Sequence, residues 1–422
     1  MLPRWAWCLL CLVLAAIAPA AERNKFQPRT HDWPQWQGPD RNGISHETGL
    51  LADWPKDGPP LVWKIKHIGT GYSTPSVAAG RIFGLSWRGK DEVVWALDES
   101  TGKELWAKRI AEARPAPGGE AREGSRSTPT VDGDRLYALG QNGDLVCMDM
   151  ADGDLHWHKN LVKDFHGGVP AWGYSESPLV DGDKLVCTPG GKEATLVALD
   201  KKTGDPIWKA QVPQGDGAAY ASVIAADVHG LRQYIQFLHN GVVGVAADDG
   251  KFLWRYDQPH NGTANCSTPI FAHGCVFAAS GYGTGGGLVR LIRKGAETRA
   301  EQVYFSKQMV NQHGGMVLVD GYVYGSNEGQ LCCLDFKSGK VMWQDRHPGK
   351  GSITCADGRL YYRNEGGPVM LVEANPKKYI EHGRFNQPDR SGPAAWPHPV
   401  IANGKLYLRD QNLLLCYDVK EH

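Results

Sequence analysis

The sequence predicts an all-β fold built from a repeated unit, and one recurring phrase carries that prediction. Residues 96–106 read ALDESTGKELW, which we interpret as the end of one strand, a turn at Thr101-Gly102 and a second strand that finishes in Trp106. Similar phrases return at residues 147–157, 198–208, 244–254 and 333–343. A period of roughly 35 to 50 residues is typical of repeat architectures.

The residue types of the phrase suit a tight turn between two strands. The aspartate, such as Asp98, can accept hydrogen bonds from amides of the turn, and the glycine tolerates a positive φ. The tryptophan is a large flat side chain that can fill the gap between neighbouring units and donate its N–H to a partner. The copy at residues 244–254 keeps the glycine and the tryptophan but has Ala246 in place of the aspartate. We interpret all these residues as scaffold.

Each unit is expected to contain four strands that alternate apolar and polar residues. Opening strands start near Ser73, Ser127, Ser175, Ala221, Ser267, Gly314, Ser352 and His398. Aromatic residues mark the outer strands at Trp63, Trp106, Trp157, Trp208, Trp254, Tyr304, Trp343 and Tyr379. Each series has eight members, so the sequence predicts eight units.

The two ends of the chain are expected to share one unit. Trp63 precedes the first opening strand, and residues 416–418 follow the last one with no outer strand behind them. Residues 61–65 are therefore expected to supply the missing strand, which closes a ring and protects its edges. The sequence thus predicts a single eight-bladed β-propeller of four-stranded antiparallel blades over residues 61–422.

Two segments precede the propeller. Residues 1–20 have a positive charge at Arg4, a short apolar run and a small-x-small end, which together indicate a cleaved signal peptide. The protein is therefore expected in the periplasm or secreted. Residues 21–60 are rich in Trp, Pro and Gly and are expected to form an irregular but ordered lead-in, in which Trp33, Trp36 and Trp54 pack onto the propeller.

Composition narrows the class of partner. Lys+Arg and Asp+Glu are 46 each, so no net field favours nucleic acid. After the signal peptide, no segment is apolar and long enough to span a membrane as a helix. A protein, peptide or polymer ligand is the expected partner.

The phrase A-x-D-x-x-T-G-x-x-x-W closely resembles the tryptophan-docking repeat of the pyrroloquinoline-quinone (PQQ) propeller superfamily, which includes quinoprotein alcohol dehydrogenases and the non-enzymatic BamB-type assembly factors. The stretches DWPQWQGPDRNGIS and NQHGGMVLVDGYVYG look like those of exported PQQ-like propellers of planctomycetes. The likeness covers nearly all of the mature chain. The resemblance is strong evidence for the fold. It says little about the activity, because the repeated residues belong to the structural scaffold.

Strand direction places the candidate binding residues on one face. The loops that lead into the first strands and those that join second to third strands should lie together, on what we term the top face. No catalytic residue is predicted there. The candidate binding residues are His313, Asn311, Arg126, Glu176, Arg363, Arg390, His398, Arg409 and Asp410. Other aromatic side chains expected on this face are Tyr72, Trp172, Tyr174 and Tyr282.

Several of these candidates have a structural alternative. His313 lies beside glycines that would give a ligand access to backbone, yet it could equally form a hydrogen bond across the channel mouth. Arg390 and the pair Arg409-Asp410 could clamp a ligand or form an ion pair that pins the last blade.

The function expected first is a non-catalytic, BamB-like binding scaffold with no cofactor. The alternative implied by the resemblance is a quinoprotein dehydrogenase that holds PQQ over calcium and often stacks the quinone on a vicinal disulfide. Glu176, Asn265 and Asn311 could offer oxygen ligands, but we find no aspartate in those loops, and the adjacent cysteines Cys332-Cys333 lie inside a strand phrase. A lyase or hydrolase that uses His313 with Glu176 or Asp410 is a third possibility.

Overall fold

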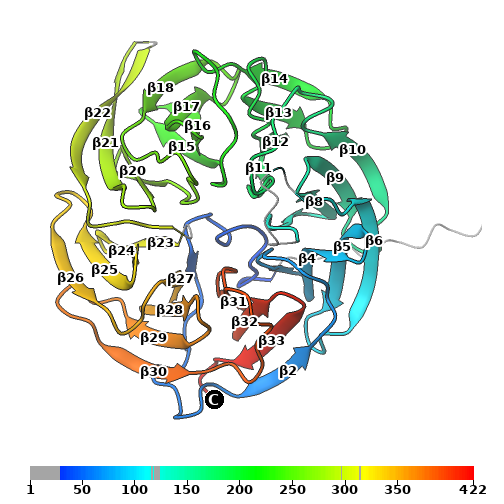
Figure 1. Cartoon of the computed structure of the whole chain (residues 1–422), viewed down its shortest axis with the longest axis vertical. Helices are drawn as coiled ribbons and strands as arrows, with labels where there is room; N and C mark the ends of the chain where they lie inside the picture. Colours follow the sequence, from blue (N-terminus) through cyan, green and yellow to red (C-terminus); the bar gives the residue numbers. More distant parts are fainter. Residues whose placement is uncertain (1–28, 116, 118–123, 296, 313–314) are drawn as a thin grey trace, which may run out of the picture.

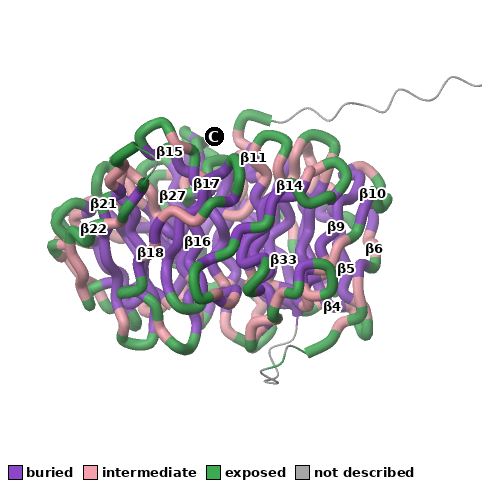
Figure 2. The backbone as a smooth tube through the Cα atoms, turned by 90° about the horizontal axis from the view of Figure 1, so that it is seen from above, coloured by how far each residue is buried: buried purple, intermediate pink, exposed green. Residues whose placement is uncertain are grey.

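Eight β-sheets stand around a central axis in the computed structural model, which describes residues 29–115, 117, 124–295, 297–312 and 315–422 (Figure 1). These residues form strands and turns and contain no helix. Seen from the edge, the strands form a buried layer, and exposed turns lie on its two faces (Figure 2). The predicted eight-bladed, all-β propeller is confirmed. The predicted signal peptide, residues 1–20, lies outside the described residues.

The blades are numbered along the chain. Blade one is β3 (Ser76–Ala78), β4 (Arg81–Arg88), β5 (Asp91–Asp98) and β6 (Glu104–Glu112). Blade two is β7 (Thr130–Asp132), β8 (Arg135–Leu139), β9 (Asp144–Asp149) and β10 (Leu155–Asn160). Blade three is β11 (Leu179–Asp181), β12 (Lys184–Cys187), β13 (Leu196–Asp200) and β14 (Pro206–Ala210). Blade four is β15 (Ile224–Val228), β16 (Leu231–Phe237), β17 (Val242–Ala246) and β18 (Phe252–Tyr256).

The second half repeats the pattern. Blade five is β19 (Ile270–Ala272), β20 (Cys275–Ser280), β21 (Gly285–Lys294) and β22 (Glu297–Ser306). Blade six is β23 (Met316–Val319), β24 (Tyr322–Asn327), β25 (Gln330–Asp335) and β26 (Val341–Asp345). Blade seven is β27 (Gly351–Ala356), β28 (Arg359–Asn364), β29 (Val369–Glu373) and β30 (Glu381–Phe385). Blade eight is β31 (Val400–Ala402), β32 (Lys405–Asp410), β33 (Leu413–Asp418) and β2 (Leu61–Ile65).

The core of the molecule lies between blades. The buried apolar residues form eight clusters, and each cluster joins two neighbouring blades. One example joins Val94 and Trp106 of blade one to Leu136 and Val146 of blade two. Every blade therefore buries both of its faces against its neighbours. Each Å² of apolar surface removed from water in this way stabilises the fold by about 25 cal/mol.

A tryptophan of one blade docks on a turn glycine of the next blade at four of these seams, with Trp63 on Gly102, Trp106 on Gly153, Trp157 on Gly204 and Trp208 on Gly250. Trp208 of blade three donates its indole N–H to the carbonyl of Ala247 in blade four at 3.1 Å. A Cβ on Gly250, the glycine of the blade-four phrase, would approach the Trp208 ring to 2.5 Å, and Gly250 has φ +73°. The glycine is required twice, for its backbone angle and for the space that the docked indole fills.

The seam between blades four and five lacks the docked tryptophan. The blade-five hairpin β21–β22 has no Thr-Gly turn on which the preceding tryptophan could dock. Trp254 of blade four therefore donates to the side chain of Gln233 in its own blade, at 2.8 Å. The extended hairpin protrudes from the ring at blade five (Figure 1).

The lead-in occupies the central channel (Figure 1). Trp33 forms two backbone hydrogen bonds of 2.8 Å with Val77 of β3. The chain then turns, and β1 (Ile44–Ser45) returns beside β27 as a parallel strand. Blade seven therefore has five strands rather than the predicted four. Trp33 and Trp54 are buried as expected, and Trp36 is partly buried.

Arg41 anchors the lead-in to the channel wall. Its buried guanidinium donates to the carbonyls of Ser177, Pro178 and Val223 at 2.9–3.2 Å. Burial lowers the pKa of Arg41 to about 10, which leaves the side chain charged at neutral pH. Arg41 therefore fixes the lead-in to blades three and four.

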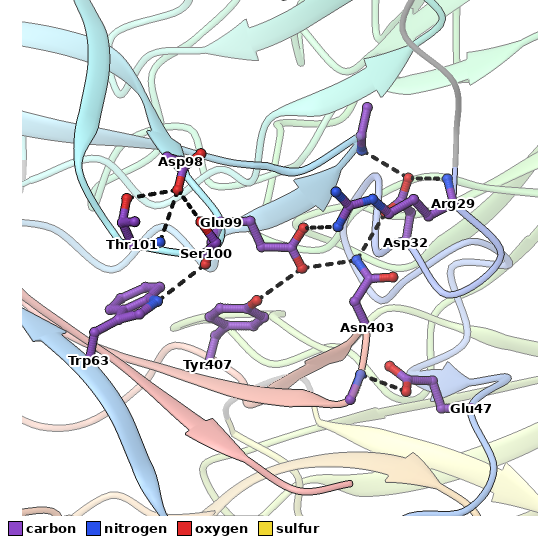
Figure 3. Close-up of polar contacts among 12 residues, drawn as sticks. Arg29, Asp32, Glu47, Trp63, Asp98, Glu99, Ser100, Thr101, Asn403 and Tyr407 are labelled. Carbon is purple, nitrogen blue, oxygen red and sulfur yellow. Dashed lines mark hydrogen bonds and ion pairs between the residues drawn. The ribbon is translucent and has the colours of Figure 1, made fainter.

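The ring closes as the sequence predicts. β2 pairs antiparallel with β33, with Leu61 opposite Tyr417 and Ile65 opposite Leu414. Figure 3 shows the seam between blades eight and one, where Trp63 donates to the carbonyl of Glu99 at 3.2 Å. The Glu99 carboxylate accepts from Tyr407 of blade eight and from Arg29 of the lead-in. The lead-in and both ends of the propeller thus meet at one carboxylate.

Candidate functional site

A cavity of about 170 Å³ opens at the centre of the top face. Its walls come from loops of seven blades and its base from the lead-in. The lining residues are Trp36, Tyr72, Thr74, Arg126, Trp172, Ser175, Tyr220, Ser222, Ala264, Cys266, Tyr282, Gln312, Trp396 and His398.

Half of this lining shares one position in the repeat, four residues before the first residue of an inner strand. The residues at this position are Tyr72, Arg126, Ser175, Tyr220, Cys266, Gln312 and Trp396, which precede β3, β7, β11, β15, β19, β23 and β31. Thr74, Ser222 and His398 lie two positions later and also face the cavity, as alternation along an extended chain requires. One register of the repeat therefore builds the wall.

Aromatic rings dominate the wall and contact one another in pairs. The Trp36 and His398 ring centroids are 4.6 Å apart, and those of Tyr72 and Trp396 are 4.7 Å apart. Trp172 and Tyr220 lie at 5.7 Å with an interplanar angle of 53°. Such tilted pairs are favourable arrangements for aromatic rings.

Arg126 is the one side chain with a permanent charge among the lining residues. Its guanidinium carbon lies 4.9 Å from the Tyr72 ring centroid, and its Nε donates to the carbonyl of Trp172 at 2.9 Å. These contacts join the loops of blades one, two and three. A ring on one side and a carbonyl on the other fix the orientation of the guanidinium.

The charge of Arg126 affects the pKa values of two neighbouring side chains, Tyr220 and Cys266. Burial raises the pKa of the Tyr220 hydroxyl to about 12 and that of the Cys266 thiol to about 12. In both cases the positive charge of Arg126 opposes that rise. Both groups are therefore neutral at physiological pH, and the Cys266 thiol is a poor nucleophile. The described lining is thus mainly aromatic, and Arg126 is its one side chain with a permanent charge.

The lead-in closes the base of the cavity. Trp36 projects into it from below and donates its indole N–H to Thr268 of blade five at 2.9 Å. Beneath this ring the Trp33 backbone pairs with β3 and Arg41 binds the opposite wall. The lead-in therefore crosses the channel from blade one to blades three and four.

Tyr282 stands at the rim. It is 51% exposed and adopts φ +56°, a conformation that non-glycine residues rarely take. It lies between Gly281 and Gly283 in the loop that joins β20 to β21. Strained backbone of this kind clusters at ligand sites.

Of the nine sequence-predicted binding residues, two line the cavity, Arg126 and His398. The backbone N–H of His398 donates to Thr74 at 3.1 Å, and its ring faces Trp36. His313 lies outside the described residues. Its neighbour Gln312 belongs to the lining.

Five other candidates are buried in the seams instead of facing a ligand. They are Asn311, Glu176, Arg363, Arg409 and Asp410. Asn311 donates to the carbonyls of Gly315 and Ser326. Glu176 accepts from the backbone and hydroxyl of Thr188 and from Gln236. Polar residues of the top loops were expected to face a ligand, but most of them satisfy the backbone groups of neighbouring loops.

The arginine cluster of blades seven and eight serves the same purpose. Arg390 forms an ion pair with buried Asp410 at 2.8 Å. Arg409 does not pair with Asp410: it donates to the carbonyls of Ser73 and Leu85 in blade one at 2.9 and 2.7 Å.

Arg363 completes this cluster. It donates to the Arg409 carbonyl and to the Gln387 amide oxygen at 2.6 Å. The geometry matches the alternative in which this cluster pins the last blade.

Sequence reasoning did not select Trp36, Tyr220, Cys266, Gln312 or Trp396 for the site. The signal that finds them is the shared register, four residues before the opening strand, read across all blades. Trp36 has no such signal, because only the path of the lead-in through the channel brings it to the base.

The described lining does not suit calcium. Calcium requires several oxygen ligands, most of them carboxylates, and none of the lining residues is an aspartate or glutamate. Over the described part of the chain, no cluster of three or more His, Cys, Asp or Glu side chains could hold a metal ion. Cys332 and Cys333 are both buried in β25 as free thiols, away from this lining.

Comparison with known families agrees with this architecture. The family model described as outer membrane protein assembly factor BamB matches residues 44–164, 90–345 and 302–379, which together span most of the 422-residue chain. The chain belongs to this family.

Individual relatives are distant. BamB of Alteromonas naphthalenivorans is 26% identical over 274 residues, which are 59% of this chain and 60% of the relative. The matched region thus spans less than two thirds of that protein.

Two solved structures share the fold. BamB from Moraxella catarrhalis superposes with a TM-score of 0.59 at 15% identity, covering 86% of this chain and 98% of that one. The quinohemoprotein alcohol dehydrogenase from Comamonas testosteroni gives a TM-score of 0.68 at 15% identity, covering 93% and 81%. At these identities the likeness establishes the propeller and does not choose between binding and redox chemistry.

The described residues include no helix with the length and apolar character needed to cross a membrane.

Proposed function

We propose that this family member is an exported, non-catalytic scaffold that binds a polypeptide or polymer partner in the cavity of its top face. The observation that carries this proposal is the wall of aromatic rings around one arginine. Binding hot spots are enriched in Trp, Tyr and Arg and form where a pocket excludes water. The relatives named as outer membrane assembly factors favour a periplasmic location for this activity.

We further propose that binding needs neither PQQ nor calcium. The support is the donor set of the cavity, which offers one guanidinium, hydroxyls, an amide and aromatic faces but no carboxylate among the described lining. The lyase or hydrolase alternative loses support from Glu176 and Asp410, since both are buried and fully engaged in hydrogen bonds.

Binding to an immobilised, denatured polypeptide tests the proposal. Trp396→Ala removes one ring of the Tyr72 pair, and we expect the affinity to fall by about 30-fold, as at an interface hot spot. Leu155→Ala is the control, because Leu155 is exposed on β10 at the outside of the ring. Both variants should keep the circular dichroism spectrum of the wild type. Equal affinity of the two variants would refute the site.

A titration with PQQ and calcium tests the second proposal. We expect no saturable change in absorbance and no alcohol-dependent reduction of an artificial electron acceptor. Tight uptake with turnover would establish the dehydrogenase alternative in its place.

A further inference from the structure

The outer strand of blade five ends its sheet with an open edge. β22 has ten residues and is the longest of the described outer strands. It is the last strand of its sheet, and no described strand pairs with its outer edge. The hairpin that it forms with β21 protrudes from the ring (Figure 1). An open edge presents unpaired backbone N–H and C=O groups, which can pair with a strand of another chain.

Other outer strands carry residues that discourage such pairing. Lysine on an edge strand is a common protection, and so is proline. The outer strands of blades eight, one, two and three each contain a lysine, namely Lys64, Lys108, Lys159 and Lys209. β22 reads ETRAEQVYFS and contains neither lysine nor proline. Its register with β21 shifts only beyond Gln302, so residues 297–302 form a regular and unprotected edge.

Pairing with β21 determines which backbone groups of β22 face outward. Two residues connect the strands, so Lys294 and Glu297 are the hydrogen-bonded pair that closes the hairpin. In an antiparallel ladder, successive residues direct their backbone groups to alternate sides of the strand. The residues that direct an N–H and a carbonyl to the open edge are therefore Thr298, Ala300 and Gln302.

Blade four holds the hairpin in position. Arg293 of β21 donates to the carbonyl of His229 at 2.8 Å. Tyr256 of β18 donates its hydroxyl to the side chain of Gln302 at 3.0 Å, and the Thr298 side chain is buried. Because these contacts already order the hairpin, pairing with a second strand requires little further ordering.

The exposed side chains of β22 make the edge complementary to itself. Arg299 and Glu301 are 62% and 48% exposed and form an ion pair within the strand at 2.5 Å. If two β22 strands pair antiparallel with Ala300 at the centre, each Arg299 lies opposite Glu301 of the second copy. Moving the centre to Arg299 or to Glu301 would place like charges opposite each other, which is unfavourable. The register centred on Ala300 also brings the outward backbone groups together, for about six hydrogen bonds between the copies.

We propose that two copies of this protein associate through their β22 edges, which joins the two blade-five sheets into one continuous antiparallel sheet. The strands of each blade stack outward from the axis, so the two rings lie side by side with their top faces pointing in opposite directions. This inference is separate from the proposed function of the cavity. The paired edge is a small interface, and we expect a dissociation constant of about 1–100 µM.

Analytical ultracentrifugation of the purified protein tests the association. Over a range of about 1–300 µM, which brackets the expected dissociation constant, the protein should shift from monomer to dimer. A monomer at every concentration would overturn the inference. Trp396→Ala, which changes the cavity, should dimerise as the wild type does. Loss of the dimer in that variant would place the contact at the cavity and also overturn pairing at β22.

Exchange of the two charges tests the register. Arg299→Glu places glutamates opposite one another, and Glu301→Arg does the same with arginines. Each variant alone should dimerise at least about tenfold more weakly than the wild type. An equimolar mixture of the two should form a heterodimer about as tight as the wild-type dimer, because unlike charges again lie opposite. Arg109→Glu is the control and should dimerise normally, since Arg109 is exposed on the outer strand β6.

Ala300→Pro tests the role of the backbone. The Ala300 N–H points to the open edge, so proline leaves the pairing with β21 intact but removes a hydrogen bond at the centre of the interface. We expect the dimer to weaken by about tenfold or more. Circular dichroism checks the fold of each variant, and the charge exchange decides alone if the proline variant does not fold. A dimer that is insensitive to the charge variants, or a mixture that forms no heterodimer, would refute pairing at β22.

Discussion

Glu176 shows how a polar residue of the top loops becomes part of the core. Its carboxylate is buried between blades three and four and accepts hydrogen bonds from Thr188 and Gln236. Burial raises its pKa to about 7, and the hydrogen bonds from Thr188 and the charge of Arg41 only partly offset that rise. An unfolded glutamate titrates near 4.3. Between these two values the folded state holds a proton that the unfolded state has lost.

The pH dependence of stability follows from this difference. Because the folded state binds more protons in that window, the free energy of unfolding falls as pH rises from about 4.3 to about 7. The wild type should therefore lose roughly 2–3 kcal/mol more than Glu176→Gln between pH 5 and pH 8. Urea denaturation at both pH values measures the difference. Constant effects of the substitution cancel in this comparison, and identical pH profiles would contradict it.

At the scale of the element, the repeat works as a lock made by two blades. The outer tryptophan of one blade rests on the glycine of the next blade's turn, and its N–H bonds to the carbonyl beside that turn. Gly102 and Gly204 would each bring a Cβ to 3.0 Å or less from a docked indole, and their φ values are +70° and +76°. Blade five has no such glycine turn, and there Trp254 of blade four donates instead to Gln233 within its own blade.

Removing one lock should be costly. Trp208→Ala deletes a buried indole and its hydrogen bond to Ala247, and we expect a loss of about 3–5 kcal/mol in the free energy of unfolding. Leu105→Ala is a matched control on β6 because Leu105 is 44% exposed, and it should cost less than ~1 kcal/mol. Urea denaturation of both variants gives the values. A cost for Trp208→Ala no larger than that for Leu105→Ala would show that the tryptophan is not a structural residue.

At the scale of the molecule, closure of the ring joins eight sheets, each of which would be only marginally stable alone, into one cooperatively folded domain. A single blade buries neither face alone, and each gains its core from two neighbours. β2 supplies the outer strand of blade eight, so the first and last residues of the ring are held in one sheet. The lead-in adds a second set of contacts across the ring, because it crosses the channel and binds blade one through Trp33 and blade three through Arg41 before β2 begins.

Truncation tests the closure. Removal of residues 413–422 deletes β33, which pairs with both β2 and β32, and exposes the edges of blade eight. We expect this truncated chain to lose the single cooperative transition of the wild type in differential scanning calorimetry. Removal of His422 alone, an exposed residue, should leave the transition unchanged. An intact transition after the longer truncation would mean that the ring does not depend on its closing sheet.

The sequence by itself determined the ring: the recurring Asp, Gly and Trp report local turn chemistry and a repeating seam, and the missing outer strand at the C-terminus identified residues 61–65 as its partner. The turn chemistry is local to each repeat, and the closing strand follows from counting outer strands along the chain, so both can be read from one sequence.

The tertiary structure decided the site. A polar residue can face a ligand only if it is not needed for hydrogen bonds to neighbouring loops and strands. Glu176, Asn311 and Arg409 make such hydrogen bonds and are buried. The path of the lead-in decided the base, because Trp36 reaches the cavity only by crossing the channel. Both outcomes depend on contacts between segments far apart in the chain, for which the sequence carries no local signal.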